Sequence, residues 1–139
     1  MTLPAKIDTT AAMAAYIYAD TSWPAGFAIH ALELPPGFAA SSAVLILPDG
    51  GIGREIPVTE ERFTFWCYGA TPVAGRAVVD ALFRVLHRQA PRNVTIAAGT
   101  AIVGPIMWAM GPSYMREPVT EWPRWICAVD VTFGEWVLP

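Results

Sequence analysis

The most restrictive feature of the sequence is an alternating strand pattern that leads directly into a helix start. Residues 62–69 place Phe63, Phe65 and Cys67 on one face and Thr64, Trp66 and Tyr68 on the other. Thr71 followed by Pro72 is typical of a helix N-terminus, because threonine caps free N–H groups and proline lacks an N–H that the first turn cannot use. This segment therefore predicts a strand covered on both faces, followed by a helix.

The predicted helix, residues 72–88, has an apolar stripe and a charged face. The stripe has helical spacing and consists of Ala74, Ala77, Val78, Ala81, Leu82, Val85 and Leu86. The charged face carries Arg76, Asp80, Arg84 and Arg88, each four residues from the next. Such a face is either an ordinary solvated surface or part of an ion-paired seam between subunits, and the sequence leaves both interpretations open.

The remaining patterns add one helix and several strands. A helix is expected at residues 10–20, capped by Thr9 or Thr10, and residues 48–53 are expected to form a turn. Strands are expected at residues 27–34, 43–47, 93–103, 106–110 and 124–133, with a long loop at 111–123. The order predicts an α+β fold, with a mostly antiparallel sheet and two helices packed on one face, in a single domain of residues 1–139.

Composition limits the possible functions. Apolar residues make up 54% of the chain and charged residues 15%, which excludes intrinsic disorder and leaves apolar surface that another subunit can cover. The formal net charge of -3 lacks the basic surplus of a tight DNA-binding protein.

No catalytic, cofactor-binding or metal-ligating residues are predicted. The glycine-rich segment 48–53 matches neither phosphate-binding pattern. His87 has no His or carboxylate three or four residues away. Glu33 lies three residues after His30, but on a strand these two side chains point to opposite faces, as do those of Glu60 and Glu61. These residues are interpreted as structural or solvated.

The cysteines and the uncharged segment 94–115 bear on cellular location. Cys67 and Cys127 have no metal-binding spacing, and we interpret them as reduced, buried packing residues on neighbouring strands. Residues 94–115 contain no charge, but glycines and prolines interrupt them, which favours β-structure over a membrane span. Neither a secretory signal nor a membrane association is expected.

Large flexible and aromatic side chains cluster in the second half of the chain. Met107, Trp108, Met110, Tyr114 and Met115 precede Trp122 and Trp125 around the predicted loop. Such side chains are enriched at protein interfaces, although they can also close a core over a sheet. The predicted interface residues are Trp108, Met110, Tyr114, Met115, Arg76, Asp80 and Arg84.

The layout resembles the tail terminator (tail completion, minor tail) proteins of long-tailed bacteriophages. The resemblance rests on the first helix, the strand ending near Pro48–Gly51, the Phe63–Gly69 strand that leads into a helix, and the Trp122–Val131 segment. It covers nearly the whole chain through patterns of strand and helix rather than through a catalytic signature.

This resemblance implies a non-enzymatic virion protein without cofactors. It implies a ring, typically hexameric, that caps the head-proximal end of the tail tube and joins it to the head–tail connector protein. The implied partners are further copies of the chain, the tail tube protein, the connector protein and genomic DNA that passes through the lumen without specific binding. Assembly would take place in the host cytoplasm.

Two alternatives remain open at this point. One is another head–tail connector component, such as a head completion or stopper protein. The other is a small bacterial α+β enzyme or ligand-binding domain, which would have a closed, partly polar pocket between the sheet and the Trp-rich loop.

Overall fold

The computed structural model describes residues 8–52, 58–87, 91–97 and 99–138, which form two helices and a six-stranded sheet. In chain order the elements are α1 (Thr9–Ala19), β1 (Ala28–Ala31), β2 (Ala43–Ile52), β3 (Val58–Tyr68), α2 (Pro72–Leu86), β4 (Arg92–Ile96), β5 (Gly99–Tyr114) and β6 (Arg124–Leu138).

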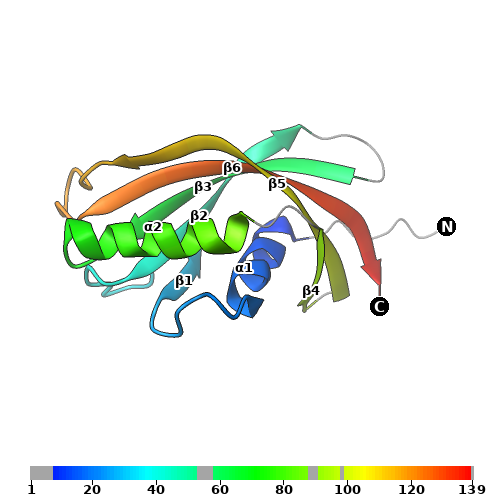
Figure 1. Ribbon diagram of the computed structural model, residues 1–139, viewed down its shortest axis with the longest axis horizontal. Coiled ribbons are helices and arrows are strands. Elements are labelled where there is room, and N and C mark those ends of the chain that lie inside the picture. Colours follow the sequence, from blue (N-terminus) through cyan, green and yellow to red (C-terminus); the bar gives the residue numbers. More distant parts are fainter. Residues whose placement is uncertain (1–7, 53–57, 88–90, 98, 139) are drawn as a thin grey trace.

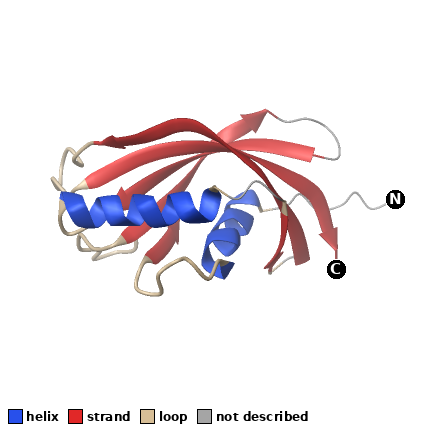
Figure 2. Cartoon of the chain, viewed as in Figure 1, coloured by secondary structure: helices blue, strands red, loops and turns tan. Residues whose placement is uncertain are grey.

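The strand order across the sheet is β1-β2-β3-β6-β5-β4. The centre is a long antiparallel pair, in which β3 runs against β6 from Val58↔Gly134 to Tyr68↔Arg124. The two helices and the curled sheet agree with the predicted α+β class (Figures 1 and 2).

The prediction of a mostly antiparallel sheet with two helices on one face requires correction, because the sheet is mixed and curled. β1 runs parallel to β2, with Ala28 opposite Ala43 and Ala31 opposite Ile46. Parallel neighbours require a connection that returns to the starting end of the first strand. Residues 32–42 provide this return, with positive φ values at Leu32 (72°) and Gly37 (76°).

Helix α1 lies between the two edges of the curled sheet, where it contacts both β1 and β4 (Figure 1). The Asp20 carboxylate at its C-terminal end, 1% exposed, accepts a hydrogen bond from Nη1 of Arg92 at 2.9 Å. The Arg92 guanidinium also lies over the Tyr16 ring, 5.3 Å from its centroid. Arg92, the first residue of β4, therefore fastens one sheet edge to the helix.

The N-terminal cap of α1 differs from the prediction by one residue. Asp8 is the N-cap, and its side chain accepts a hydrogen bond from the backbone N–H of Ala11 at 3.0 Å. The apolar positions predicted for this helix are confirmed as buried: Ala12, Met13, Tyr16 and Ile17.

Helix α2 begins as predicted, with the Thr71 side chain accepting a hydrogen bond from the N–H of Ala74 at 3.1 Å. Its buried face is rotated from the predicted stripe: Gly75 and Val79 are buried, whereas Ala77 is exposed. The reason lies in the first turns, where Gly75 packs against Gly69 and Trp125. A glycine at this contact lets the helix approach the sheet and turns Ala77 outward. Arg88 lies outside the described residues.

Two predicted irregular segments form strand instead. A turn was expected at residues 48–53, but strand β2 continues through Pro48 and Gly51 to Ile52. Its pairing with β3 shifts register between Pro48 and Gly51. Gly53 lies outside the described residues. Strand β5 extends to Tyr114, so the expected loop at 111–123 begins four residues later. In both cases a neighbouring strand supplies hydrogen-bond partners that local sequence does not reveal.

Both cysteines are buried and free, on the adjacent strands β3 and β6 as predicted. A hydrogen bond with Cys127, together with burial, raises the pKa of the Cys67 thiol well above its ordinary value. We expect neither thiol to react with a thiol reagent at neutral pH in the folded protein, and both to react in denaturant.

A Cys67→Ala, Cys127→Ala double variant is expected to lose about 2 kcal/mol of unfolding free energy through unfilled core volume. Assembly should be affected little. Rapid labelling of the folded protein, or loss of a metal-binding or catalytic activity in the variant, would contradict the packing role.

Candidate assembly surface

A tight approach of α2 to the end of β3 positions the candidate surface. Gly69 follows β3, and a Cβ at this position would lie 2.2 Å from the backbone N of Gly75. Gly75 in turn faces the Trp125 ring of β6. The first two turns of α2 are thereby held beside Trp125, with the opposite side of the helix open to solvent.

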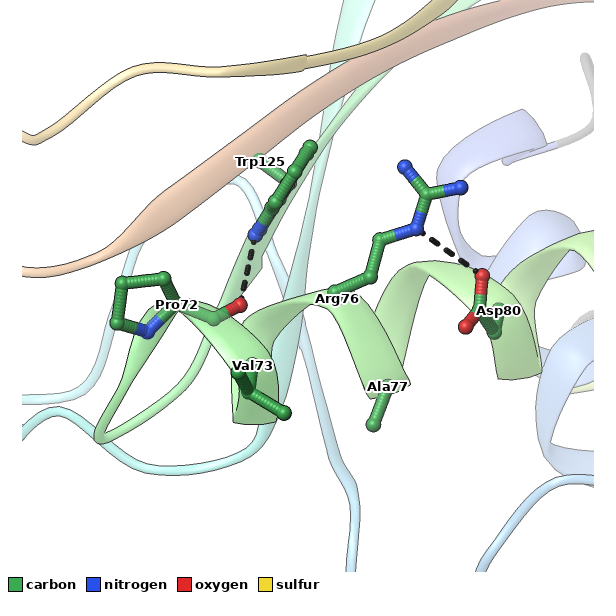
Figure 3. Close-up of a pocket in the computed structure, with 6 residues that line it drawn as sticks. All are labelled: Pro72, Val73, Arg76, Ala77, Asp80 and Trp125. Carbon is green, nitrogen blue, oxygen red and sulfur yellow. Dashed lines mark hydrogen bonds and ion pairs between the residues drawn. The ribbon is translucent and has the colours of Figure 1, made fainter.

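A shallow hollow of about 370 Å³ lies beside the first turns of α2, with Trp125 at one of its walls (Figure 3). Its lining includes Val73, which is 80% exposed. The full lining is Pro72, Val73, Arg76, Ala77, Asp80 and Trp125. The hollow opens to solvent, unlike the closed pocket that the ligand-binding alternative would require.

Trp125 contacts predicted interface residues of both α2 and β5. Its indole N–H donates to the Pro72 carbonyl at 3.0 Å, and the Arg76 guanidinium lies 5.1 Å from its ring centroid. On its other side Trp125 packs against Tyr114, with ring centroids 5.2 Å apart. Arg76 also forms an ion pair with Asp80 at 3.2 Å. The side chains of Tyr114, Trp125, Arg76 and Asp80 therefore form one continuous row from β5 to α2.

The structure separates the remaining predicted residues. Trp108 is half-buried against Phe83 of α2, with ring centroids 4.3 Å apart, and therefore packs within its own chain. Met110 is opposite Ala128, which places its side chain on the face of the sheet that faces away from α2. Met115 and Arg84 are exposed, Met115 beyond the end of β5 and Arg84 on the outward face of α2.

Much of the outer edge of β5 is also open. Strand β4 pairs with β5 only over Gly99–Val103, and within the described ranges no other strand pairs with the outer side of residues 104–114. Proteins commonly protect such edges with charged side chains, but residues 94–115 contain none. Bulges and prolines are the protective features here, and the edge remains apolar, with Met107 68% exposed.

The face opposite the helices carries a second aromatic group. Arg124, 6% exposed, lies over the Trp66 ring at 4.3 Å from its centroid, beside Tyr68. The Phe38 ring packs on both Tyr68 and Trp122. Residues of the two neighbouring loops thus cover this end of the face.

Among the described residues, no group of three His, Cys, Asp or Glu could hold a metal ion. Within the same ranges, neither helix is long and apolar enough to cross a membrane. Of the uncharged segment at 94–115, residues 94–96 lie in β4 and residues 99–114 form β5, so the segment is β-structure as its glycines and prolines predicted.

Comparisons with known proteins give one type of match. No model of a known protein family and no curated protein matches the sequence. Among solved structures, the chain is similar to one in the "virion of native gene transfer agent (GTA) particle", with a TM-score of 0.58 and 11% identity. The two chains share a fold. The similarity covers 93% of this chain and 95% of the GTA chain, so the common fold extends over nearly the full length of both.

Four residues that line the hollow are absent from the predicted interface: Pro72, Val73, Ala77 and Trp125. Val73 is an apolar residue in the first turn of α2, outside the row of charged residues that marks the predicted face. It shares that face, since positions 73, 76, 77, 80 and 84 align at helical spacing. Trp125 belongs to the aromatic cluster in the sequence, and no local spacing shows that it contacts Pro72 and Arg76 of α2.

Proposed function

We propose that this chain is a structural protein of a phage-like virion, and more specifically the tail terminator. In this role copies of the chain form a ring, most simply a hexamer, that ends the tail tube and joins it to the head–tail connector. The role requires no catalytic residue, cofactor or metal ion. Genomic DNA would pass through the ring without specific binding.

The observation that carries this proposal is the fold likeness to a chain of the GTA virion along almost the entire length of both chains. The apolar edge of β5 and the hollow beside α2 add support, because a subunit of a ring must present surface to its neighbours. The net charge of -3 also suits a DNA conduit, since a lumen that bound phosphates tightly would retard the genome.

We expect the purified chain, alone or with tail tubes added, to form a closed ring of about 90 kDa, six times its mass of 15.0 kDa. Mass photometry gives the stoichiometry and negative-stain imaging gives the closure. A strict monomer at micromolar concentration that also fails to assemble on tail tubes would contradict the proposal.

Labelling of particles with an antibody against this chain tests its position. The terminator role requires label at the head-proximal end of the tail. Label confined to the head would support the alternative role of a head completion protein.

A further inference from the structure

The connection between β5 and β6 ends in a rigid turn that presents an exposed valine. Val119 is 88% exposed, the largest exposed fraction among the large apolar side chains described. The hairpin below it is held by two backbone bonds, from Met115 N to Arg124 O at 2.8 Å and from Glu117 N to Trp122 O at 3.0 Å. Val119 thus stands at the tip of a supported turn.

The Glu117 carboxylate organises this turn from within. It accepts hydrogen bonds from the backbone N–H of Val119 at 3.1 Å and from both the N–H and the hydroxyl of Thr120. These bonds, the Thr120 hydroxyl foremost, hold the pKa of Glu117 below its usual range, so the turn stays anionic at neutral pH. A turn ordered in this way loses little conformational entropy when it docks.

The turn and the hollow beside α2 both present apolar side chains, and the net charges around them are opposite in sign. The hollow is lined by Val73 and Ala77 together with the Arg76–Asp80 ion pair, and the exposed Arg84, one turn beyond Asp80, gives this face of α2 a net positive charge. The turn has an apolar tip at Val119, and its flanks carry two anions and one cation: Glu117, Glu121 and Arg116. A contact between them would bring opposite net charges together around an apolar centre.

We propose that the Val119 turn of one copy docks into the α2 hollow of a second copy. This inference rests on the proposed ring and names the contact that builds it. The two surfaces differ, so the contact is heterologous, and heterologous contacts close into rings when the rotation between neighbours permits. The chain's net charge of -3 makes copies repel one another overall, which a contact of opposite local charges opposes.

Val119→Asp and Val73→Asp test the two sides separately. Each places a carboxylate in the contact, and we expect each to weaken subunit association about 30-fold or more, the effect of losing an interface anchor. Both positions are highly exposed, at 88% and 80%, so the subunit should still fold. At position 73 the new carboxylate also lies in the first turn of α2, where it favours the helix.

Tyr18→Asp is the matched control, since Tyr18 is 80% exposed on α1 and lies outside both surfaces. It adds the same charge and should leave assembly at the wild-type level. Circular dichroism confirms folding of all three variants.

An equimolar mixture of the two valine variants provides the sharpest readout. Each variant lacks one half of the contact, so one intact turn and one intact hollow remain in the mixture. We expect mixed dimers of about 30 kDa, twice the chain mass of 15.0 kDa, that neither variant forms alone.

Rings that persist in both valine variants would overturn this inference and leave the proposed function standing. Loss of rings in Tyr18→Asp alone would overturn it as well. A wild-type chain that forms only dimers, which the valine variants abolish, would support the docking contact and overturn the ring.

Discussion

A Gly69→Ala variant is expected to lose about 3 kcal/mol or more of unfolding free energy, at or above the upper end of overpacking costs. The added Cβ would lie 2.2 Å from the backbone N of Gly75 and 2.6 Å from the carbonyl carbon of Ala74. Both contacts are with backbone in the first turns of α2, so no side chain can rotate away. The helix must shift, and the contacts of Trp125 must shift with it.

Urea unfolding of the variant measures this loss. Gly26→Ala is the matched control, because a Cβ at Gly26 would meet nothing within 4 Å. The control should stay within about 0.5 kcal/mol of the wild type. Equal stability of the two variants would show that α2 does not approach β3 as closely as described.

Replacing Arg92 with alanine is expected to cost about 2 to 4 kcal/mol of unfolding free energy. Its guanidinium donates to the Asp20 carboxylate at 2.9 Å, and that carboxylate is only 1% exposed. Loss of a charged hydrogen bond at a buried carboxylate costs far more than loss of one in water. The stacking of Arg92 on Tyr16 disappears as well.

Arg76→Ala provides the comparison, since it removes an ion pair whose partners are 45% and 54% exposed. Such exposed pairs contribute about 0.5 kcal/mol or less within a helix. Thermal unfolding of the two variants should therefore separate them clearly. A loss in Arg76→Ala as large as that in Arg92→Ala would mean that burial does not govern these pairs.

The elements predicted most accurately are those that local physics determines. The alternation over Phe63, Phe65 and Cys67 places all three in the core, and Thr71 with Pro72 marks the start of α2. Side-chain period and helix capping act within a few residues, so the sequence displays them directly.

The predictions that were wrong depend on neighbours distant in sequence. The parallel pairing of β1, the passage of β2 through Pro48 and the extension of β5 to Tyr114 each require a particular adjacent strand. Pro48 continues as strand because it pairs with Phe63, and Tyr114 because it pairs with Trp125. Propensity alone favours turn or loop at such positions.

The candidate surface was predictable only in parts. The charged face of α2 follows from its helical spacing, and Tyr114 belongs to a visible aromatic cluster. Trp125 brings them together through Pro72 and Arg76, which no sequence spacing reveals. The split of Trp108 from Met110 depends on β5 register shifts that likewise appear only in three dimensions.

The position of α1 between β1 and β4 imposes an order on folding. The helix precedes all six strands of the described sheet, yet β4 belongs to the sheet only through β5, and β5 only through β6. The sheet edge that holds α1 is therefore incomplete until β6 has paired with β3 and β5. A chain truncated before residue 124 lacks β6, so we expect α1 to have no complete sheet to pack against and the native fold not to form.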